Sequence, residues 1–272
     1  MDYWIREFFD GERTAEVERM TQIQVHAHAI SVVDLVKKFE DVTAVDGLSF
    51  NVGVGEIFGL LGPNGAGKST IINILSGILE PTGGRATVLG FDVQRESTEV
   101  KERIGVCPQE PAFFPYLTGR ENIELMGNLQ GMPKEKLRER TDWLLDQMGL
   151  GATSSRRAGK YSGGMVRRTS LAMALVHDPE VAFLDEPTVG LDPQSRRATW
   201  GLIEDLKGRG RTVILTTHYI EEAEALADRV GIIDHGKLIA LDTPRALMEE
   251  HGAENLEEVF IKLTGRKIRE EV

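Results

Sequence analysis

The sequence predicts an α/β fold built on a mainly parallel sheet. The first observation is a series of short apolar, strand-like segments at residues 30–36, 56–62, 181–185, 212–218 and 229–234. The second is that helical patterns lie between strands, such as PQSRRATWGLIEDLKGRG with its terminal glycines. Strands that alternate with helices favour a parallel sheet covered by those helices. The third is that 41% of the 272 residues are hydrophobic, which is enough to form a sizeable core.

The pattern along the chain predicts an N-terminal extension over residues 1–27 followed by a single domain over residues 28–272. The core of that domain is predicted to comprise residues 28–110 and 181–272. An inserted helical subdomain is predicted over residues 111–180, where strand patterns are scarce. The extension is compatible with a weakly packed tail or with a short docking helix, whose apolar face would carry Trp4, Ile5, Phe8 and Phe9.

Two local features refine these regions. Thr118 is followed three residues later by Glu121, which predicts a capping box at the start of a helix in the inserted subdomain. Residues 266–272 are charged and are predicted to be a frayed end.

Charge and cysteine content restrict the function classes. The formal net charge of −11 repels phosphate backbones, so general nucleic-acid binding is not expected. The single cysteine, Cys107, excludes an internal disulfide, fits a reducing cytoplasm, and is predicted to be buried. No apolar run approaches the ~18 residues that a membrane span requires. We therefore expect the chain to be soluble by itself, with any membrane role depending on another chain.

A glycine-rich loop predicts a nucleotide site. Residues 62–69 match the pattern G-x-x-x-x-G-K-[ST] in full, with a strand pattern before them and a helix pattern after them. Such a loop turns its backbone N–H groups toward phosphate oxygens, and the helix adds its positive dipole end. Lys68 is predicted to reach the β- and γ-phosphates of the nucleotide, and Ser69 to ligate magnesium. The predicted nucleotide-binding residues here are Gly62, Pro63, Asn64, Gly65, Ala66, Gly67, Lys68, Ser69 and Thr70.

Polar residues at the ends of other strands complete the predicted site. Asp185 ends the apolar segment VAFLD and is predicted to hold magnesium, because ligands bind at the carboxyl ends of parallel strands. Glu186 follows it and is predicted to polarise the attacking water. His218 ends a parallel strand, which places it at the same edge to contact the γ-phosphate. Gln109 follows another short strand, from which it could reach the magnesium or the water.

These motifs in this order resemble those of the ATP-binding cassette (ABC) ATPases. The segment YSGGM at 161–165 is similar to the family signature, and GLD at 190–192 is similar to the loop that crosses the dimer interface. The resemblance spans roughly residues 28–265. It implies a P-loop NTPase core with a mainly parallel sheet, a small antiparallel β part and an inserted α-helical subdomain. The implied activity is hydrolysis of ATP to ADP and phosphate, with ATP and Mg²⁺ in the site.

The signature departs from the usual family form at two positions. Tyr161 stands where the family usually has Leu, and Met165 stands where it has Gln, so the amide donor near the partner's nucleotide is lost. The segments YSGGMVRR, EPTVGLDPQSR, THYIEEAEALADRV and LEEVFIKLTGR together resemble the daunorubicin-resistance-type exporter branch. Both departures are therefore expected to be features of that branch.

The resemblance also implies how the ATP is shared between chains. Two cassettes would form a head-to-tail dimer, in which each ATP lies between Lys68 of one copy and Ser162 of the other. We expect a homodimer, because this single chain carries every motif, although a heterodimer is also possible. Phe39 is at the position of an aromatic residue that stacks on adenine, and its alternative role is that of a core residue. The implied contacts outside the loop are Phe39, Ser162, Gly163, Gly164 and Asp192.

Exporter function is the further implication of the resemblance. The chain would lie at the cytoplasmic face of the cell membrane as a peripheral subunit that drives a separate integral-membrane transporter subunit. Residues Phe113, Phe114 and Tyr116 would suit docking of that subunit, although packing within the helical subdomain is an equally good interpretation. The alternatives are a soluble cassette ATPase in a non-transport assembly machine and a nucleotide-dependent module without turnover.

Overall fold

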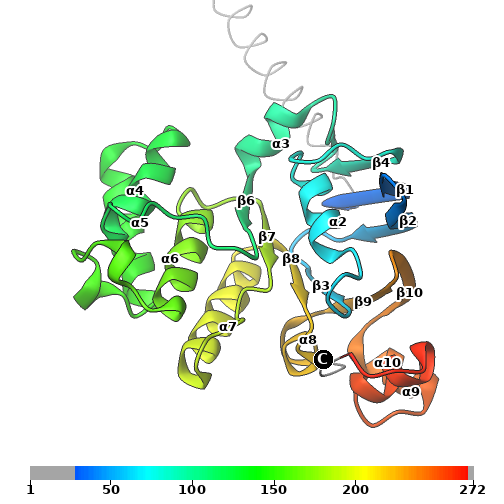
Figure 1. The fold of residues 1–272 in the computed structure, drawn as a ribbon. Coiled ribbons are helices and arrows are strands. Elements are labelled where there is room, and N and C mark those ends of the chain that lie inside the picture. Colours follow the sequence, from blue (N-terminus) through cyan, green and yellow to red (C-terminus); the bar gives the residue numbers. More distant parts are fainter. Residues whose placement is uncertain (1–27, 269–272) are drawn as a thin grey trace, which may run out of the picture.

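The computed structural model describes residues 28–268, which form two sheets with helices packed around them (Figure 1). The predicted extension over residues 1–27, including its docking-helix interpretation, lies outside the described residues, as do residues 269–272.

The larger sheet has six strands, and five of them are parallel, as the sequence predicts. Only β10, at one edge, runs antiparallel to its neighbour. The parallel pairing brings the carboxyl ends of β3, β8, β7 and β6 to one edge of the sheet. In order across the sheet the strands are β10 (Lys237–Asp242), β9 (Arg229–Asp234), β3 (Ile57–Leu61), β8 (Thr212–Thr217), β7 (Val181–Asp185) and β6 (Ile104–Cys107).

The smaller sheet is antiparallel, and its presence confirms the predicted fold class. It consists of β2 (Val42–Val52), β1 (Ile30–Phe39), β4 (Gly83–Val88) and β5 (Phe91–Asp92), in that order. One hydrophobic cluster joins it to the larger sheet, where the rings of Phe50 and Phe58 stack with centroids 5.2 Å apart. The smaller sheet is thereby fixed against the strand that leads into the glycine loop.

The helices surround the larger sheet, and three of them form a separate group. Figure 1 shows α4, α5 and α6 gathered to one side of the larger sheet, beyond β6, in the stretch predicted to be helical. α2 contacts both sheets and follows the glycine loop. The bounds are α2 (Lys68–Leu75), α3 (Ser97–Arg103), α4 (Gly119–Leu129), α5 (Lys134–Gln147), α6 (Gly163–Leu175), α7 (Pro193–Gly208), α8 (Ile220–Leu226), α9 (Pro244–His251) and α10 (Leu256–Thr264), with short 3-10 turns at Gly151–Thr153 and Ala158–Lys160.

The predicted capping box at the start of α4 is confirmed. The Glu121 backbone N–H donates to Thr118 Oγ1 at 3.1 Å, and the Thr118 backbone N–H donates to Glu121 Oε2 at 2.7 Å. These reciprocal bonds satisfy two backbone donors at the helix start. Cys107 is fully buried at the end of β6, also as predicted.

The prediction of a frayed end is wrong for residues 266–268. Arg266 pairs with Asp234 at the end of β9, and Ile268 is buried in a cluster with Leu247 and Phe260. An ion pair and apolar burial therefore hold the chain against the sheet beyond α10. Within residues 28–268, no helix has the length and apolar character of a membrane span.

Candidate functional site

The glycine loop between β3 and α2 is shaped by backbone approaches that only glycine permits. Gly67 has φ of 102°, and a Cβ there would lie 2.3 Å from the carbonyl oxygen of Ala44. A Cβ on Gly62 would lie 2.3 Å from the carbonyl oxygen of Ile233. Both glycines of the motif are thus required by the fold itself. A hollow of about 190 Å³ lies over the loop, and it is lined by Ala44, Asn64, Gly65, Gly67, Lys68, Ser69, Thr70, Gln109 and Glu186.

Lys68 folds back over its own loop. Its Nζ donates to the carbonyl oxygens of Gly62 and Pro63 at 2.7 Å and 3.1 Å, and lies 3.7 Å from Glu186 Oε1. The side chain is 5% exposed, and burial lowers the pKa of Lys68, although the carboxylates of Glu186 and Asp185 oppose that effect. The ammonium group is therefore held at the mouth of the hollow by contacts that an incoming anion can replace.

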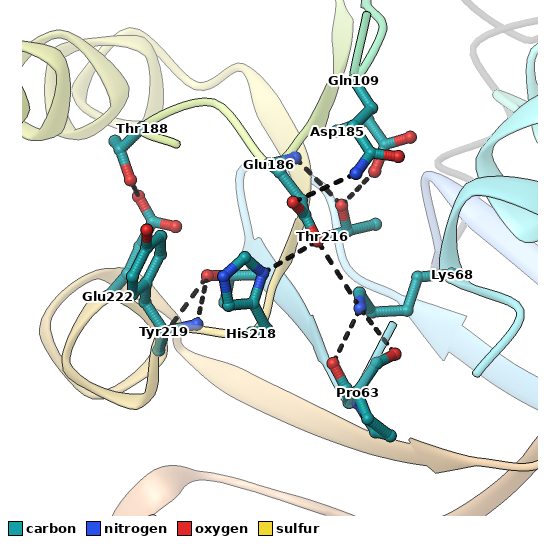
Figure 2. Close-up of polar contacts among 12 residues, drawn as sticks. Pro63, Lys68, Gln109, Asp185, Glu186, Thr188, Thr216, His218, Tyr219 and Glu222 are labelled. Carbon is teal, nitrogen blue, oxygen red and sulfur yellow. Dashed lines mark hydrogen bonds and ion pairs between the residues drawn. The ribbon is translucent and has the colours of Figure 1, made fainter. Parts of the chain in front are cut away.

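The end of β7 and its neighbour β8 fix the two acidic residues. Asp185 accepts a hydrogen bond from the Thr216 hydroxyl, which in turn accepts from the backbone N–H of Glu186 at 3.0 Å. Glu186 has φ of 51°, a left-handed conformation that costs a non-glycine residue about 1–3 kcal/mol. The hydrogen bonds to Thr216 turn the Glu186 side chain toward the glycine loop (Figure 2).

Three predicted residues converge on the Glu186 carboxylate. His218 Nδ1 lies 3.0 Å from Oε1, Gln109 Nε2 donates to Oε2 at 3.3 Å, and Lys68 lies on the same side (Figure 2). Burial by itself raises the pKa of Glu186, but the hydrogen bond and charge of His218, together with Lys68 and Gln109, outweigh it and lower the pKa. Glu186 is consequently an ionised, oriented carboxylate, which is the form a general base requires.

The oxygen-bearing side chains predicted for magnesium suit a hard cation. Ser69 and Gln109 line the hollow together, whereas Asp185 is not among its lining residues and accepts a hydrogen bond from Thr216. Hydroxyl, amide and carboxylate oxygens are the donors that Mg²⁺ takes alongside water and substrate phosphates. Within residues 28–268 there is no cluster of three or more His, Cys, Asp or Glu side chains able to hold a metal. The Ser69 hydroxyl and the Gln109 amide, which line the hollow, fit a magnesium ion that takes its other oxygen ligands from water and a nucleotide.

The signature residues lie apart from this hollow. Ser162 caps α6, where its hydroxyl accepts from the Met165 N–H at 3.3 Å, and neither it nor Gly163 nor Gly164 lines the hollow. Ser162 and Gly163 are exposed. Asp192 likewise caps α7, through bonds from the backbone N–H groups of Gln194 and Ser195 at 3.0 Å each. Within one chain, the predicted nucleotide contacts thus form two separate groups.

Two aromatic residues explain parts of the sequence pattern. Phe39, at the end of β1, is 45% exposed, so the alternative of a core phenylalanine is wrong. Lys37 Nζ lies 5.0 Å from the centroid of that ring. Tyr161 donates from its hydroxyl to the Thr153 carbonyl at 2.7 Å and packs on Gly119, where a Cβ would lie 2.3 Å from the hydroxyl. The first signature departure is thus matched by a glycine at the start of α4.

Three residues that sequence reasoning missed are buried next to the site. Thr216 has a signal in the strand itself, because it is two residues before His218 and so faces the same side. Arg167 is 4% exposed in α6, and its position in a polar run gives no sign of burial. Glu222 is fully buried although it belongs to an acidic helix start.

Glu222 connects the segment after Glu186 to the segment after His218. Its Oε1 accepts from Thr188 Oγ1 at 2.8 Å and from Trp200 Nε1 at 3.0 Å, while Oε2 has no partner among the described residues. Figure 2 shows Thr188 and Glu222 side by side next to Tyr219. Burial raises the pKa of Glu222, and the bonds from Thr188 and Trp200 reduce that shift.

We expect Glu222→Gln to raise the melting temperature at pH 8 and to change it little at pH 5. A raised folded-state pKa means that the native state binds a proton more tightly than the unfolded state, so wild-type stability falls as pH rises through that pKa. The amide oxygen can keep both accepted bonds without ionising, so the variant should lose this dependence of stability on pH. Thermal unfolding at the two pH values measures this effect. Equal destabilisation at both would show that Glu222 is bound there as a carboxylate.

Comparison with known proteins agrees with this site. The family model described as ABC transporter matches residues 45–189, which is more than half of the chain. The daunorubicin/doxorubicin resistance ATP-binding protein of Streptomyces peucetius is 47% identical over 83% of this chain and 68% of its own length. The Nod factor export ATP-binding protein I of Rhizobium sp. (strain N33) is 45% identical over 85% of this chain and 76% of its own.

A solved structure extends the similarity to three dimensions. It is a dimeric post-hydrolysis state of an ATP-binding cassette bound to ADP and phosphate, and it aligns with a TM-score of 0.73 at 26% identity, over 79% of this chain and 98% of that one. The sequence matches cover the glycine loop, the strand that ends at Asp185 and the signature segment between them. The chain therefore belongs to the ABC transporter family, as one of its ATP-binding, ATP-hydrolysing cassettes.

Proposed function

We propose that this chain is the energising subunit of an ABC exporter, which hydrolyses ATP to drive efflux of a drug, a lipid or another hydrophobic substrate through a separate membrane subunit. The observation that carries the proposal is the convergence of Lys68, Gln109 and His218 on an ionised Glu186 beside the glycine loop. The export direction is supported by relatives that are named for drug resistance and Nod factor export.

The chemistry follows from the positions of these side chains. Lys68 would give up its contacts with the Glu186 carboxylate and the loop carbonyls and would bind the β- and γ-phosphates of ATP instead. Glu186 would then accept a proton from a water whose oxygen bonds to the γ-phosphorus, while the bond to the β-phosphate oxygen breaks and ADP leaves. His218 would hold Glu186 and contact the γ-phosphate. Mg²⁺, held by Ser69, Gln109 and Asp185, would neutralise charge on the phosphates.

The dimer is the second part of the proposal. Ser162 is exposed at the positive end of α6, where its hydroxyl and free N–H groups can bind phosphate. Its own glycine loop is a separate site, so the γ-phosphate that it binds would belong to a second copy of this chain. ATP would bridge the two copies with Gly163, Gly164 and Asp192 at the interface, and adenine would stack on Phe39. The dimeric cassette described above supports this arrangement.

A groove between the sheet and the helical region would take the membrane subunit. It has a volume of about 290 Å³ and a mainly apolar lining that includes Ile78, Val106, Ala112, Met126 and Met173. Val106 belongs to β6, and Gln109 follows that strand, so a segment bound in the groove would lie next to the catalytic site. This contact would place the chain at the cytoplasmic face of the cell membrane as a peripheral subunit.

Exposed aromatic residues follow Ala112, which lines the groove, and they give a prediction. Phe114 is 52% exposed and Tyr116 is 83% exposed, whereas Phe113 packs partly against the helical core. We expect the double change Phe114→Ser and Tyr116→Ser to reduce recovery of the membrane subunit by at least about tenfold, because exposed aromatic anchors dominate such contacts. The amount of membrane subunit recovered with the tagged chain measures the effect. The melting temperature of the variant should equal that of the wild-type chain.

Val54→Ser is the matched control, because Val54 is 64% exposed in the turn before β3, away from the groove. Equal recovery of the membrane subunit with the aromatic variant and with this control would remove these aromatic residues from the docking surface.

The experiment that tests exporter function is affinity purification from native membranes in mild detergent, with identification of the bound proteins by mass spectrometry. A polytopic membrane protein in near one-to-one amount supports the exporter and identifies its partner. Recovery of soluble proteins only would instead favour the alternative, a soluble ABC ATPase in a non-transport assembly machine.

A further inference from the structure

Arg167 lies inside the molecule and binds only to backbone oxygens. It is 4% exposed, and no carboxylate within residues 28–268 lies at ion-pair distance from it. Its guanidinium donates to five carbonyl groups, at 2.5 Å to Pro108, 2.9 Å to Gln109, 2.6 Å to Glu186 and 3.3 Å to Pro187, with a further short bond to Asp185. Five charge-assisted bonds from one buried side chain fix the backbone around it.

The five carbonyl groups belong to two chain segments that carry catalytic side chains. Pro108 and Gln109 follow β6, whereas Asp185, Glu186 and Pro187 follow or end β7. β6 and β7 are adjacent parallel strands whose pairing ends before these residues. Beyond the last paired residues of β6 and β7, the Arg167 guanidinium holds the two segments at a fixed spacing. The bond from Gln109 Nε2 to Glu186 Oε2 depends on that spacing.

Arg167 also holds the backbone of Glu186. The left-handed conformation of this residue persists only where its surroundings stabilise it. The N–H group of Glu186 donates to the hydroxyl and carbonyl of Thr216, at 3.0 Å and 3.1 Å. The Glu186 carbonyl accepts from Arg167. Thr216 and Arg167 therefore secure the two ends of the same residue.

We propose that Arg167 is a positioning residue for ATP hydrolysis, which holds Glu186 and Gln109 in the geometry that places the attacking water. It reaches them from α6, the helix that Ser162 caps. The inference rests on the proposed function, and it adds a residue that touches neither nucleotide nor water. Its loss should lower the rate of the chemical step and leave nucleotide binding, which depends on the glycine loop, intact.

The neighbouring Arg168 is a matched control. Its side chain is also partly buried in α6, but it donates to the carbonyls of Met148 and Gly164, at 2.5 Å and 3.3 Å, within the helical region. Arg168→Lys thus perturbs the same helix without touching the ends of β6 or β7.

The test compares Arg167→Met, Arg167→Lys and Arg168→Lys with the wild-type chain. Steady-state ATPase assays give kcat and KM, and equilibrium ATP binding is measured with each change in a Glu186→Gln background. We expect Arg167→Met to lower kcat by about 10- to 100-fold, as a misplacement of catalytic groups does, with KM and ATP affinity within about threefold of wild type. Arg167→Lys should recover part of kcat, because an ammonium can bond to some of the five carbonyls. Arg168→Lys should keep kcat near wild type.

Two results would overturn the inference. The first is a wild-type kcat in an Arg167 variant that is folded. If Arg167→Met does not fold, Arg167→Lys is the variant that decides. The second is a fall in kcat that is matched by an equal loss of ATP affinity and reproduced by Arg168→Lys, which would mark a structural role. The wild-type chain in the same assay separates the two proposals. If it hydrolyses no ATP, the proposed function fails and the inference fails with it.

Discussion

Glu186→Gln is expected to lower kcat for ATP hydrolysis by about 10²- to 10⁴-fold, while the protein still binds ATP. The amide keeps the shape of the side chain and the bond from Gln109 but cannot accept a proton from water. In the wild-type chain the pKa of Glu186 is lowered, so the carboxylate stays ionised at neutral pH. We expect its protonation, and the loss of activity that follows from it, only at a pH below 4.5, the ordinary pKa of a glutamate. Phosphate release and equilibrium binding of ATP measure the two properties separately.

Glu180→Gln is the control for that change, because Glu180 lies just before β7 and its side chain pairs on the surface with Arg103. Its kcat should match that of the wild-type chain. A Glu186→Gln protein that turns over ATP at the control rate would contradict the assignment of Glu186 as the general base.

Lys68→Ala is expected to lower kcat/KM for ATP by about 10²- to 10³-fold, the effect of removing one preorganised donor to the reacting charge. The change removes the ammonium that the loop aims at the phosphates. It also removes a cation from beside the buried Glu186 carboxylate, which raises the pKa of that base. Titration calorimetry and steady-state kinetics together measure the loss of binding and of turnover.

Lys237→Ala provides the comparison for the loss of a surface cation. Lys237 is 61% exposed in β10 and pairs with Asp46, and neither residue lines the hollow. If Lys68→Ala binds and hydrolyses ATP as this control does, Lys68 does not contact the phosphates, and the hollow over the loop holds some other ligand.

The sequence was sufficient to predict the residues that meet at the sheet edge. A motif with fixed spacing specifies the glycine loop, and the apolar runs before Asp185 and His218 define strands that must end at the same edge once the sheet is parallel. Strand ends depend on local patterns, so positions derived from them were reliable. The antiparallel sheet was predicted as a class, but of its strands only β1 was named individually.

Contacts between segments far apart in the sequence could not be predicted. The left-handed backbone of Glu186 depends on Thr216 in one strand and on Arg167 in a helix of the inserted region. Ile268 follows a charged segment, and its burial depends on a cluster formed by α9 and α10. The exposure of Phe39 depends on how the smaller sheet packs, which no local pattern specifies.

The measurement that tests the central claim most directly is the molar mass of the Glu186→Gln protein by light scattering, first with Mg²⁺ and ATP and then with Mg²⁺ and ADP. The ATP-bridged arrangement of Lys68 and Ser162 predicts twice the monomer mass with ATP and the monomer mass with ADP. A protein that binds ATP yet keeps the monomer mass would contradict a homodimer closed by ATP.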